Sequence, residues 1–117
     1  MRHHKNTRTL GRSQNQRRAL LRHLARSLIL EERIQTTEAK AKELRPFVER
    51  LVTKSKHDTL SSRRLILERL GNETVATRKL FAVIGPRYQE RAGGYTRITK
   101  LATAKADARK MAQIEFV

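Results

Sequence analysis

The chain has 117 residues, which is enough for one domain with a modest core. It contains no cysteine, so disulfides, thiolate zinc sites and cysteine nucleophiles are excluded. Its 27 lysines and arginines against 11 acidic residues give a formal net charge of +16, which predicts a polyanionic partner because such a chain repels itself. No stretch has the roughly 20 apolar residues of a membrane-spanning helix, and residues 1–12 lack the apolar segment of a secretory signal. We therefore expect a cytoplasmic protein without a membrane partner.

The positive charge is concentrated at the start of the chain. Residues 1–30 contain eight basic residues and no Asp or Glu, and the first acidic residue is Glu31. Residues 1–12 contain one large aliphatic residue after the first methionine, Leu10, so they bury too little apolar area to fold alone. We predict a basic, extended arm at residues 1–12, which would bind a polyanion such as RNA, and a single domain at residues 13–117.

A first helix is predicted at residues 13–30. Ser13 and Gln16 have the spacing of a capping box, in which two side chains satisfy the free backbone amides at a helix start. The apolar stripe of this helix consists of Leu20, Leu21, Leu24, Ala25, Leu28 and Ile29. A basic row is rotated well away from that stripe and contains Arg18, Arg22 and Arg26. The helix therefore presents a core face and a basic face.

A short strand and a second helix follow. The residues at 33–36 favour a strand, and Thr37 can cap a helix that runs to about Ser55. The predicted core face of this helix is Ala41, Leu44, Val48, Leu51 and Val52. Pro46 lies inside the pattern, where it removes a backbone hydrogen bond, so we expect the helix to bend or break there.

Two further helices are predicted at residues 59–70 and 72–84. The apolar residues of the first are Leu60, Leu67 and Leu70. Gly71 suits its C-terminal stop, and Asn72 can cap the next helix. The pair Gly85-Pro86 is expected to end that helix.

Two strands are predicted in the C-terminal part of the chain. After the turn signal Gly93-Gly94, residues 95–101 and 111–117 have strand character, and the second alternates apolar with polar residues. The linker at 102–110 can form a loop or a frayed turn. The fold class is α+β, with about four helices packed on a small sheet, a C-terminal β-hairpin and a basic extended N-terminal arm. The strand at 33–36 can join the hairpin.

The arm and the first helix supply the main candidates for RNA contact. An arginine fork donates two parallel hydrogen bonds to phosphate and its plane can stack on an unpaired base. The candidates are Arg2, Lys5, Arg8, Arg12, Arg17, Arg18, Arg22 and Arg26. The alternative is a solvated charged surface, but eight basic residues without an acid favour RNA. His3 and His4 have no nearby Cys, Asp or Glu, which favours contact with a base or phosphate and predicts no metal site.

Two other groups are candidates for RNA binding. Backbone amides and ammonium groups at the second helix start could hold an anion, or the threonines could form a plain N-cap. This group is Thr36, Thr37, Lys40 and Lys42. Around Gly93-Gly94, charge and aromatic rings alternate, and the tyrosines could stack on RNA or pack in the core. This group is Arg87, Tyr88, Arg91, Tyr95 and Arg97.

Four segments together resemble the bacterial large-subunit ribosomal protein seventeen family over nearly the whole chain. They are MRHHKNTRTLGR, RRALLRHLARSLILEERIQTTEAKAKELRPFVERLVT, LFAVIGPRYQERAGGYTRITKL and MAQIEFV, and the most specific motifs are RIQTTEAKAKE and GGYTRI. The resemblance implies an α+β domain on large-subunit ribosomal RNA near the peptide tunnel exit, with the arm reaching along the RNA. It also implies neighbouring large-subunit ribosomal proteins as partners. This sequence has Ala106, Asp107 and Lys110 where the family usually has a Gly-Asp pair and a proline, so we expect a loop of different shape at 102–110.

Other function classes are less well supported by the sequence. A sequence-specific DNA regulator would need outward Asn or Gln on a recognition helix, and the first helix offers few. The Gly93-Gly94 pair lacks the spacing and the Lys-Ser/Thr ending of a nucleotide-binding loop. Glu31 and Glu32 are adjacent in a helix, so they point in different directions and do not form a catalytic pair. We expect no enzyme activity, no cofactor and no small-molecule substrate.

Overall fold

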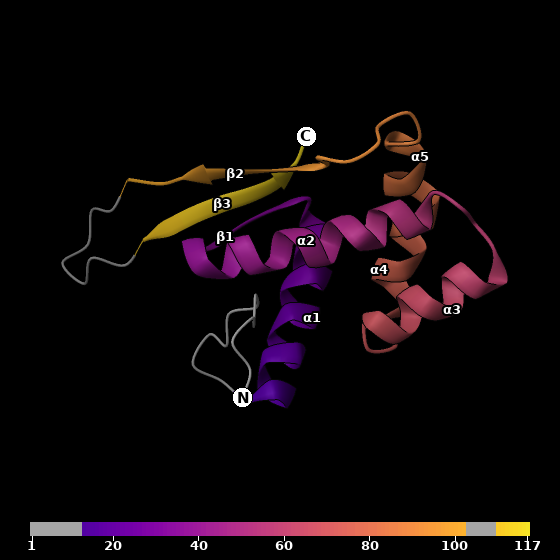
Figure 1. The fold of residues 1–117 in the computed structure, drawn as a ribbon, viewed down its shortest axis with the longest axis horizontal. Helices are drawn as coiled ribbons and strands as arrows, with labels where there is room; N and C mark the ends of the chain where they lie inside the picture. The colour runs from indigo at the N-terminus through magenta and orange to yellow at the C-terminus, as the bar shows by residue number, and fades with distance from the viewer. Residues whose placement is uncertain (1–12, 103–109) are drawn as a thin grey trace, which may run out of the picture.

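The computed structural model describes residues 13–102 and 110–117 and has the predicted α+β class. The elements are α1 (Gln14–Glu31), β1 (Arg33–Thr37), α2 (Glu38–Ser55), α3 (Leu60–Arg69), α4 (Thr74–Lys79), the π-helical turn η1 (Leu80–Ile84), α5 (Gly85–Arg87), β2 (Thr96–Lys100) and β3 (Met111–Phe116). Figure 1 shows α2 running along the sheet, with α3, α4 and α5 gathered at one end of it. The predicted arm at 1–12 lies outside the described residues.

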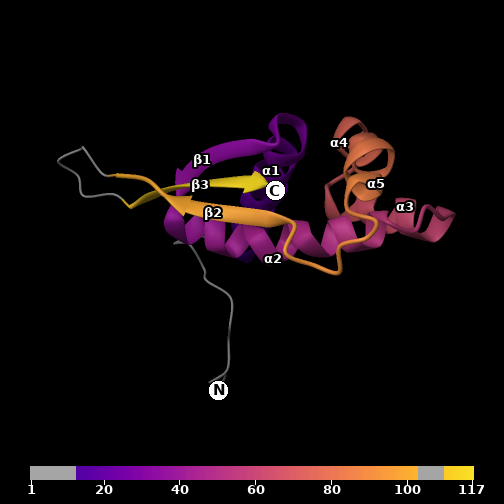
Figure 2. The ribbon, with the colours of Figure 1, turned by 90° about the horizontal axis from the view of Figure 1, so that it is seen from above.

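The three strands form an antiparallel sheet in the order β1-β3-β2. Figure 2 shows β3 between the other two strands. Ile114 of β3 lies opposite Ile34 of β1 and Ile98 of β2. The predicted alternation in β3 is confirmed, because Ala112, Ile114 and Phe116 are buried. The prediction that the strand beginning at residue 33 joins the C-terminal strand pair is also confirmed.

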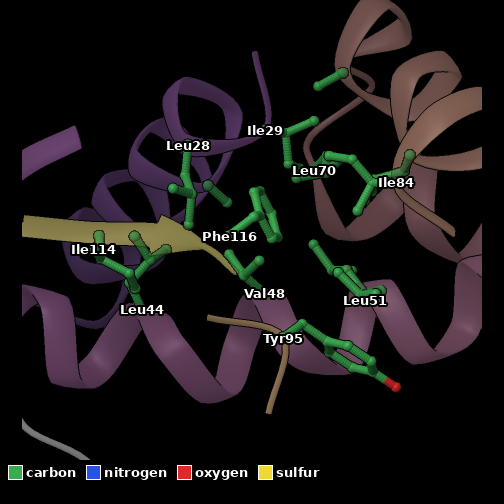
Figure 3. Close-up of a cluster of buried hydrophobic side chains, with 14 of the residues drawn as sticks. Leu28, Ile29, Leu44, Val48, Leu51, Leu70, Ile84, Tyr95, Ile114 and Phe116 are labelled. Atoms are coloured by element: carbon green, nitrogen blue, oxygen red, sulfur yellow. The ribbon is translucent and has the colours of Figure 1, made fainter. Parts of the chain in front are cut away.

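The core lies between the sheet, α1, α2 and the helices that follow. Every residue of the predicted core face of α2 is buried, and α1 buries Leu21, Ala25, Leu28 and Ile29. Figure 3 shows side chains from α1, α2, η1 and β3 meeting in one cluster. Burying each large aliphatic side chain stabilises the fold by about 1.5–3 kcal/mol. This shared core fixes α1 and α2 relative to each other.

Both ends of α1 are closed by specific hydrogen bonds. The predicted capping box is present: the Ser13 hydroxyl accepts from the Gln16 amide at 3.3 Å, and the Gln16 side chain accepts from the Ser13 amide at 3.3 Å. At the other end Glu32 adopts a left-handed conformation with a φ of 67°. Its amide donates to the Leu28 carbonyl, and its own carbonyl accepts from the Phe116 amide at 3.1 Å. The end of α1 is thereby joined to β3.

Pro46 does not break α2, so the expectation of a break was wrong. The helix is continuous from Glu38 to Ser55. Pro46 and Lys42 are both exposed, so water can reach the Lys42 carbonyl that loses its usual donor. Leu44 and Val48, on either side of the proline, are fully buried. Packing of the apolar face therefore outweighs the local cost of the proline.

The connection from α3 to α4 differs from the prediction. Asn72 does not cap α4: it has a φ of 65°, and its amide donates to the Leu67 carbonyl at 2.7 Å. Together with Gly71, which has a φ of 68°, it terminates α3. Glu73 takes the cap position of α4 without a side-chain hydrogen bond. The prediction of Leu60 as an apolar residue of the packed face of α3 was also wrong, because its side chain is 65% exposed. Ile66 and Leu70 are the buried residues here.

The fourth helical segment continues past Gly85-Pro86, which does not end it as expected. The Gly85 amide donates to the Leu80 carbonyl in the wider π-helical turn. A Cβ on Gly85 would lie 2.7 Å from the Ser55 carbonyl oxygen, so glycine permits close contact with the end of α2. Pro86 lies at the start of α5, and the φ that its ring fixes is compatible with the helical path. The helical path therefore ends only after Arg87.

Candidate nucleic-acid interface

Arg22 of the basic row is used inside the domain. It lies at the middle of α1, opposite the C-terminal end of α3. Its guanidinium donates from Nε to the carbonyl of Arg69 at 3.2 Å and from Nη2 to the carbonyl of Glu68 at 3.5 Å. The Arg69 carbonyl lies at the end of α3, where the last carbonyls lack their usual helical donors, and the Glu68 carbonyl also accepts from the Gly71 amide at 3.0 Å. A cation at this end is also favoured by the helix dipole. Arg22 therefore holds α3 against α1.

The remaining arginines of α1 differ in their partners. Arg26 pairs with Glu73, with 3.0 Å between Nε and Oε2, and Arg17 lies 3.7 Å from the carboxylate of Glu43. Arg18 is exposed and has no ion pair among the residues that the structure describes. The charge of Arg18 is therefore the least compensated of this helix.

At the start of α2 the structure shows a plain N-cap. The Thr37 hydroxyl accepts from the Lys40 amide at 3.3 Å, and Thr36 is buried. Glu38 already places a carboxylate in the first turn, where the helix dipole favours negative charge. The ammonium group of Lys42 lies 2.9 Å from Glu38 and lowers the pKa of its carboxyl. The predicted N-cap is thus present, and RNA contact at this helix start stays a prediction.

Tyr88 and Tyr95 are core residues. They are 4% and 1% exposed, and their ring centroids lie 5.3 Å apart. The Tyr88 hydroxyl donates to the Val117 carbonyl, and the Tyr95 hydroxyl lies 3.0 Å from the Thr53 hydroxyl. In Figure 3 the Tyr95 ring lies beside the cluster with its oxygen pointing away from it. Of the two alternatives that the sequence left open for these rings, the structure shows core packing.

The arginines predicted around Gly93-Gly94 each contact a different part of the domain. Arg87 pairs with Glu32 at 2.6 Å, and Lys79 reaches the same carboxylate at 3.1 Å. These two cations, Arg87 above all, lower the pKa of Glu32 to about 2. Arg91 donates to the Gly94 carbonyl at 3.2 Å. Arg97 lies on β2, 3.1 Å from a carboxylate of β3, so this group does not form one cluster.

Comparison with known proteins places the chain in a family. The sequence profile described as Ribosomal protein L17 matches residues 20–117, which is most of the chain. The chain belongs to the Ribosomal protein L17 family.

Relatives from several bacteria are similar over their full length. A protein named Large ribosomal subunit protein bL17 from Gemmatimonas aurantiaca is 52% identical over 117 residues, covering 100% of this chain and 98% of the relative. A protein of the same name from Hydrogenobaculum sp. is 52% identical, and the match covers 100% of this chain and 99% of the relative. Another from Shouchella clausii is 51% identical, and the match covers 92% of this chain and 96% of the relative. The resemblance found in the motifs is thus confirmed at the level of the Ribosomal protein L17 family.

Three cations that sequence reasoning did not single out lie together beside α2 and α3. Arg50 and Lys54 on α2 and Arg69 at the end of α3 are exposed and have no ion pair within the described part of the chain. The spacing of Arg50 and Lys54 puts them on one helix face, which was a usable signal. The position of Arg69 beside them depends on how α3 packs on α2, which no local pattern reveals.

Six predicted RNA-binding residues of this Ribosomal protein L17 family member lie outside the described residues, as do residues 103–109 of the predicted linker at 102–110. The six are Arg2, His3, His4, Lys5, Arg8 and Arg12. Within residues 13–102 and 110–117, no three His, Asp or Glu side chains lie together as metal ligands. In the same residues no helix is long and apolar enough to cross a membrane.

Proposed function

We propose that this chain is a structural, non-catalytic constituent of the large subunit of the cytoplasmic ribosome and that it binds large-subunit ribosomal RNA near the exit of the peptide tunnel. The observation that carries the proposal is its identity of about half over the full length of relatives named as large ribosomal subunit proteins. Its partners are then ribosomal RNA and neighbouring ribosomal proteins.

The charge distribution supports RNA as the partner. The chain carries a net charge of +16, and residues 1–30 contain no acid. Binding of cations to phosphates releases condensed counterions, which supplies much of the affinity for nucleic acid. We assign RNA contact to the arm and to the cations without internal ion pairs, chiefly Arg18, Arg50, Lys54 and Arg69. Arg22, Arg26 and Arg87 act first in holding the fold together.

The test measures whether the chain stays with the large subunit when salt screens loose charge attraction. Lysate is separated on sucrose gradients at low and raised salt, and the chain is quantified by mass spectrometry against established large-subunit proteins. We expect constant stoichiometry in the large-subunit and whole-ribosome fractions at both salt concentrations. Loss of the chain to the top of the gradient at raised salt would contradict the proposal and indicate a dissociable nucleic-acid binder.

Deletion of residues 1–12 tests the arm separately. The domain at 13–117 is expected to fold without it, because the described residues of α1, α2, the later helices and the sheet already bury a shared hydrophobic core. We expect the truncated chain to enter subunits more slowly and to be lost at lower salt. Incorporation equal to that of the full chain would show that the arm does not contribute.

A further inference from the structure

We propose that a groove between α2 and α3 holds one unstacked nucleotide of RNA, an inference that rests on the proposed RNA binding and names the kind of RNA element recognised. The groove has a volume of about 480 Å³, and its lining includes Phe47, Arg50, Lys54, Leu65, Arg69 and Gly93. We call it the α2–α3 groove. Its volume lies in the range of about 300–1,000 Å³ that is common for small-ligand sites.

The walls of the α2–α3 groove are suited to a flat apolar group. Phe47 and Leu65 are half-buried, so part of each side chain remains open to the groove. Leu51 and Ile66 also line the groove and are buried in the core, which makes its floor part of the rigid interior. Unpaired RNA bases are commonly held by stacking on aromatic side chains. Phe47 is the aromatic ring that can serve in this way, since Tyr95 is buried.

The rim of the groove carries positive charge without compensation. Arg50, Lys54 and Arg69 are exposed and have no ion pair among residues 13–102 and 110–117. The carboxylate at the groove, Glu49, is already occupied, because it accepts from the Thr96 amide at 3.1 Å and from the Thr96 hydroxyl at 2.8 Å. The rim therefore favours an occupant that carries negative charge.

A second hollow extends the same surface toward α1. It has a volume of about 380 Å³ and is lined by Arg18, Arg22, Phe47, Glu68 and Arg69. Phe47 and Arg69 thus belong to both hollows. A strand of RNA can place phosphates near Arg18 and Arg69 while one base enters the α2–α3 groove. This continuity connects the groove to the basic face of α1.

RNA fits these observations better than a protein segment. An apolar side chain of a neighbouring protein could fill the groove, but it would leave the three rim cations without counter-charge. The chain's own residues 1–12 are basic and would add repulsion. A nucleotide brings an aromatic face and an adjacent phosphate in one unit, which matches both the walls and the rim.

The experiment compares two RNA probes that differ in one base. The first is a hairpin with a single bulged uridine, and the second has an abasic residue at the same place, so the phosphates are equal. For the full chain we expect the uridine probe to bind about tenfold more tightly, which corresponds to about 1.4 kcal/mol, within the usual range of base–aromatic stacking. Equal affinities for the two probes would overturn the proposal.

Three variants localise the effect. Phe47→Leu is expected to abolish the preference for the uridine probe, whereas Phe47→Tyr retains a ring and should preserve it. Lys54→Gln should weaken binding of both probes equally and leave the preference intact. Thermal unfolding of each variant checks that the domain remains folded. A preference that survives Phe47→Leu in a folded domain would place the base elsewhere and overturn the proposal.

Cross-linking in purified large subunits separates RNA from protein as the occupant. A photoreactive benzoylphenylalanine replaces Leu65, and the cross-linked partner is identified by mass spectrometry. A cross-link to a nucleotide supports the proposal, and a cross-link to a protein overturns it while leaving the proposed ribosomal function intact. If the chain does not sediment with subunits at all, the proposed function fails. The comparison of the two probes then still shows whether the α2–α3 groove binds a base.

Discussion

Internal ion pairing predicts which arginine of α1 contributes to RNA binding. Arg18 and Arg26 lie two turns apart on the same basic row. Arg18 has no ion pair within the described residues, whereas Arg26 lies 3.0 Å from Glu73. The two variants Arg18→Gln and Arg26→Gln remove the same charge from the same helix. A difference between them therefore reports the availability of the guanidinium for phosphate.

The expected size follows from counterion release. For single-stranded nucleic acid, the slope of log affinity against log salt changes by about 0.7 for each phosphate contact. Between about 50 and about 200 mM salt, one contact then accounts for roughly a threefold loss of affinity. We expect Arg18→Gln to reduce the slope by about 0.7 and Arg26→Gln to reduce it by less than half of that. Loss of the exposed pair with Glu73 should lower the free energy of unfolding by at most about 1 kcal/mol.

The assay is fluorescence anisotropy of a labelled uridine decamer titrated with each protein at four salt concentrations. The unmodified chain gives the reference slope, and urea unfolding confirms that both variants are folded. If Arg26→Gln reduces the slope as much as Arg18→Gln does, an ion pair with Glu73 does not limit access to phosphate. The assignment of RNA contacts from unpaired cations would then be refuted.

Three further predictions concern stability. Gly85→Ala places a methyl group 2.7 Å from the Ser55 carbonyl oxygen, so we expect the free energy of urea unfolding to fall by about 1–3 kcal/mol, whereas Gly93→Ala, with nothing within 4 Å, should leave it nearly unchanged; equal losses would contradict this packing. The pKa of Glu32 is lowered from 4.5 to about 2, so its stabilising effect is present above pH 4.5 and is lost as pH falls toward 2. The thermal unfolding temperature of Glu32→Gln should therefore depend less on pH between 4.5 and 2 than that of the unmodified chain. An equal pH dependence of the two proteins would show that ionised Glu32 does not stabilise the fold. Glu49→Ala leaves the buried amide at the start of β2 without its acceptor and should cost about 1–3 kcal/mol, whereas Glu49→Gln keeps an acceptor and should cost less.

Features that depend on a few neighbouring residues were predictable from the sequence. The capping box at Ser13, the core face of α2 and the alternation in β3 follow from local spacing, and each is present. The family resemblance also followed from contiguous motifs. Local periodicity decides the core face of α2 and the alternation in β3, because one face of each element must be buried, and the capping box needs only two residues at the right spacing.

Features that depend on packing between distant segments were not predictable. Whether Pro46 breaks α2 is decided by the burial of the residues on either side, and the continuation past Gly85 is decided by contact with the end of α2. The same holds for the candidate interface. Arg22 meets carbonyls 46 and 47 residues away, so its use inside the domain cannot be read from the basic row of α1. Arg69, by contrast, lies beside Arg50 and Lys54 only because α3 packs against α2.

The central position of β3 constrains when the sheet can form during synthesis. β1 and β2 each pair with β3 and not with each other, and β3 is translated after both. A nascent chain that stops before Met111 holds two strands whose hydrogen-bonding edges have no partner, and Ile114 and Phe116 are missing from its core. Such unpaired edges and exposed apolar surface make an incomplete chain prone to aggregation. The sheet can therefore form only after Met111–Phe116 has been translated, so the timing of its formation depends on the last strand in the sequence and not on β1 or β2.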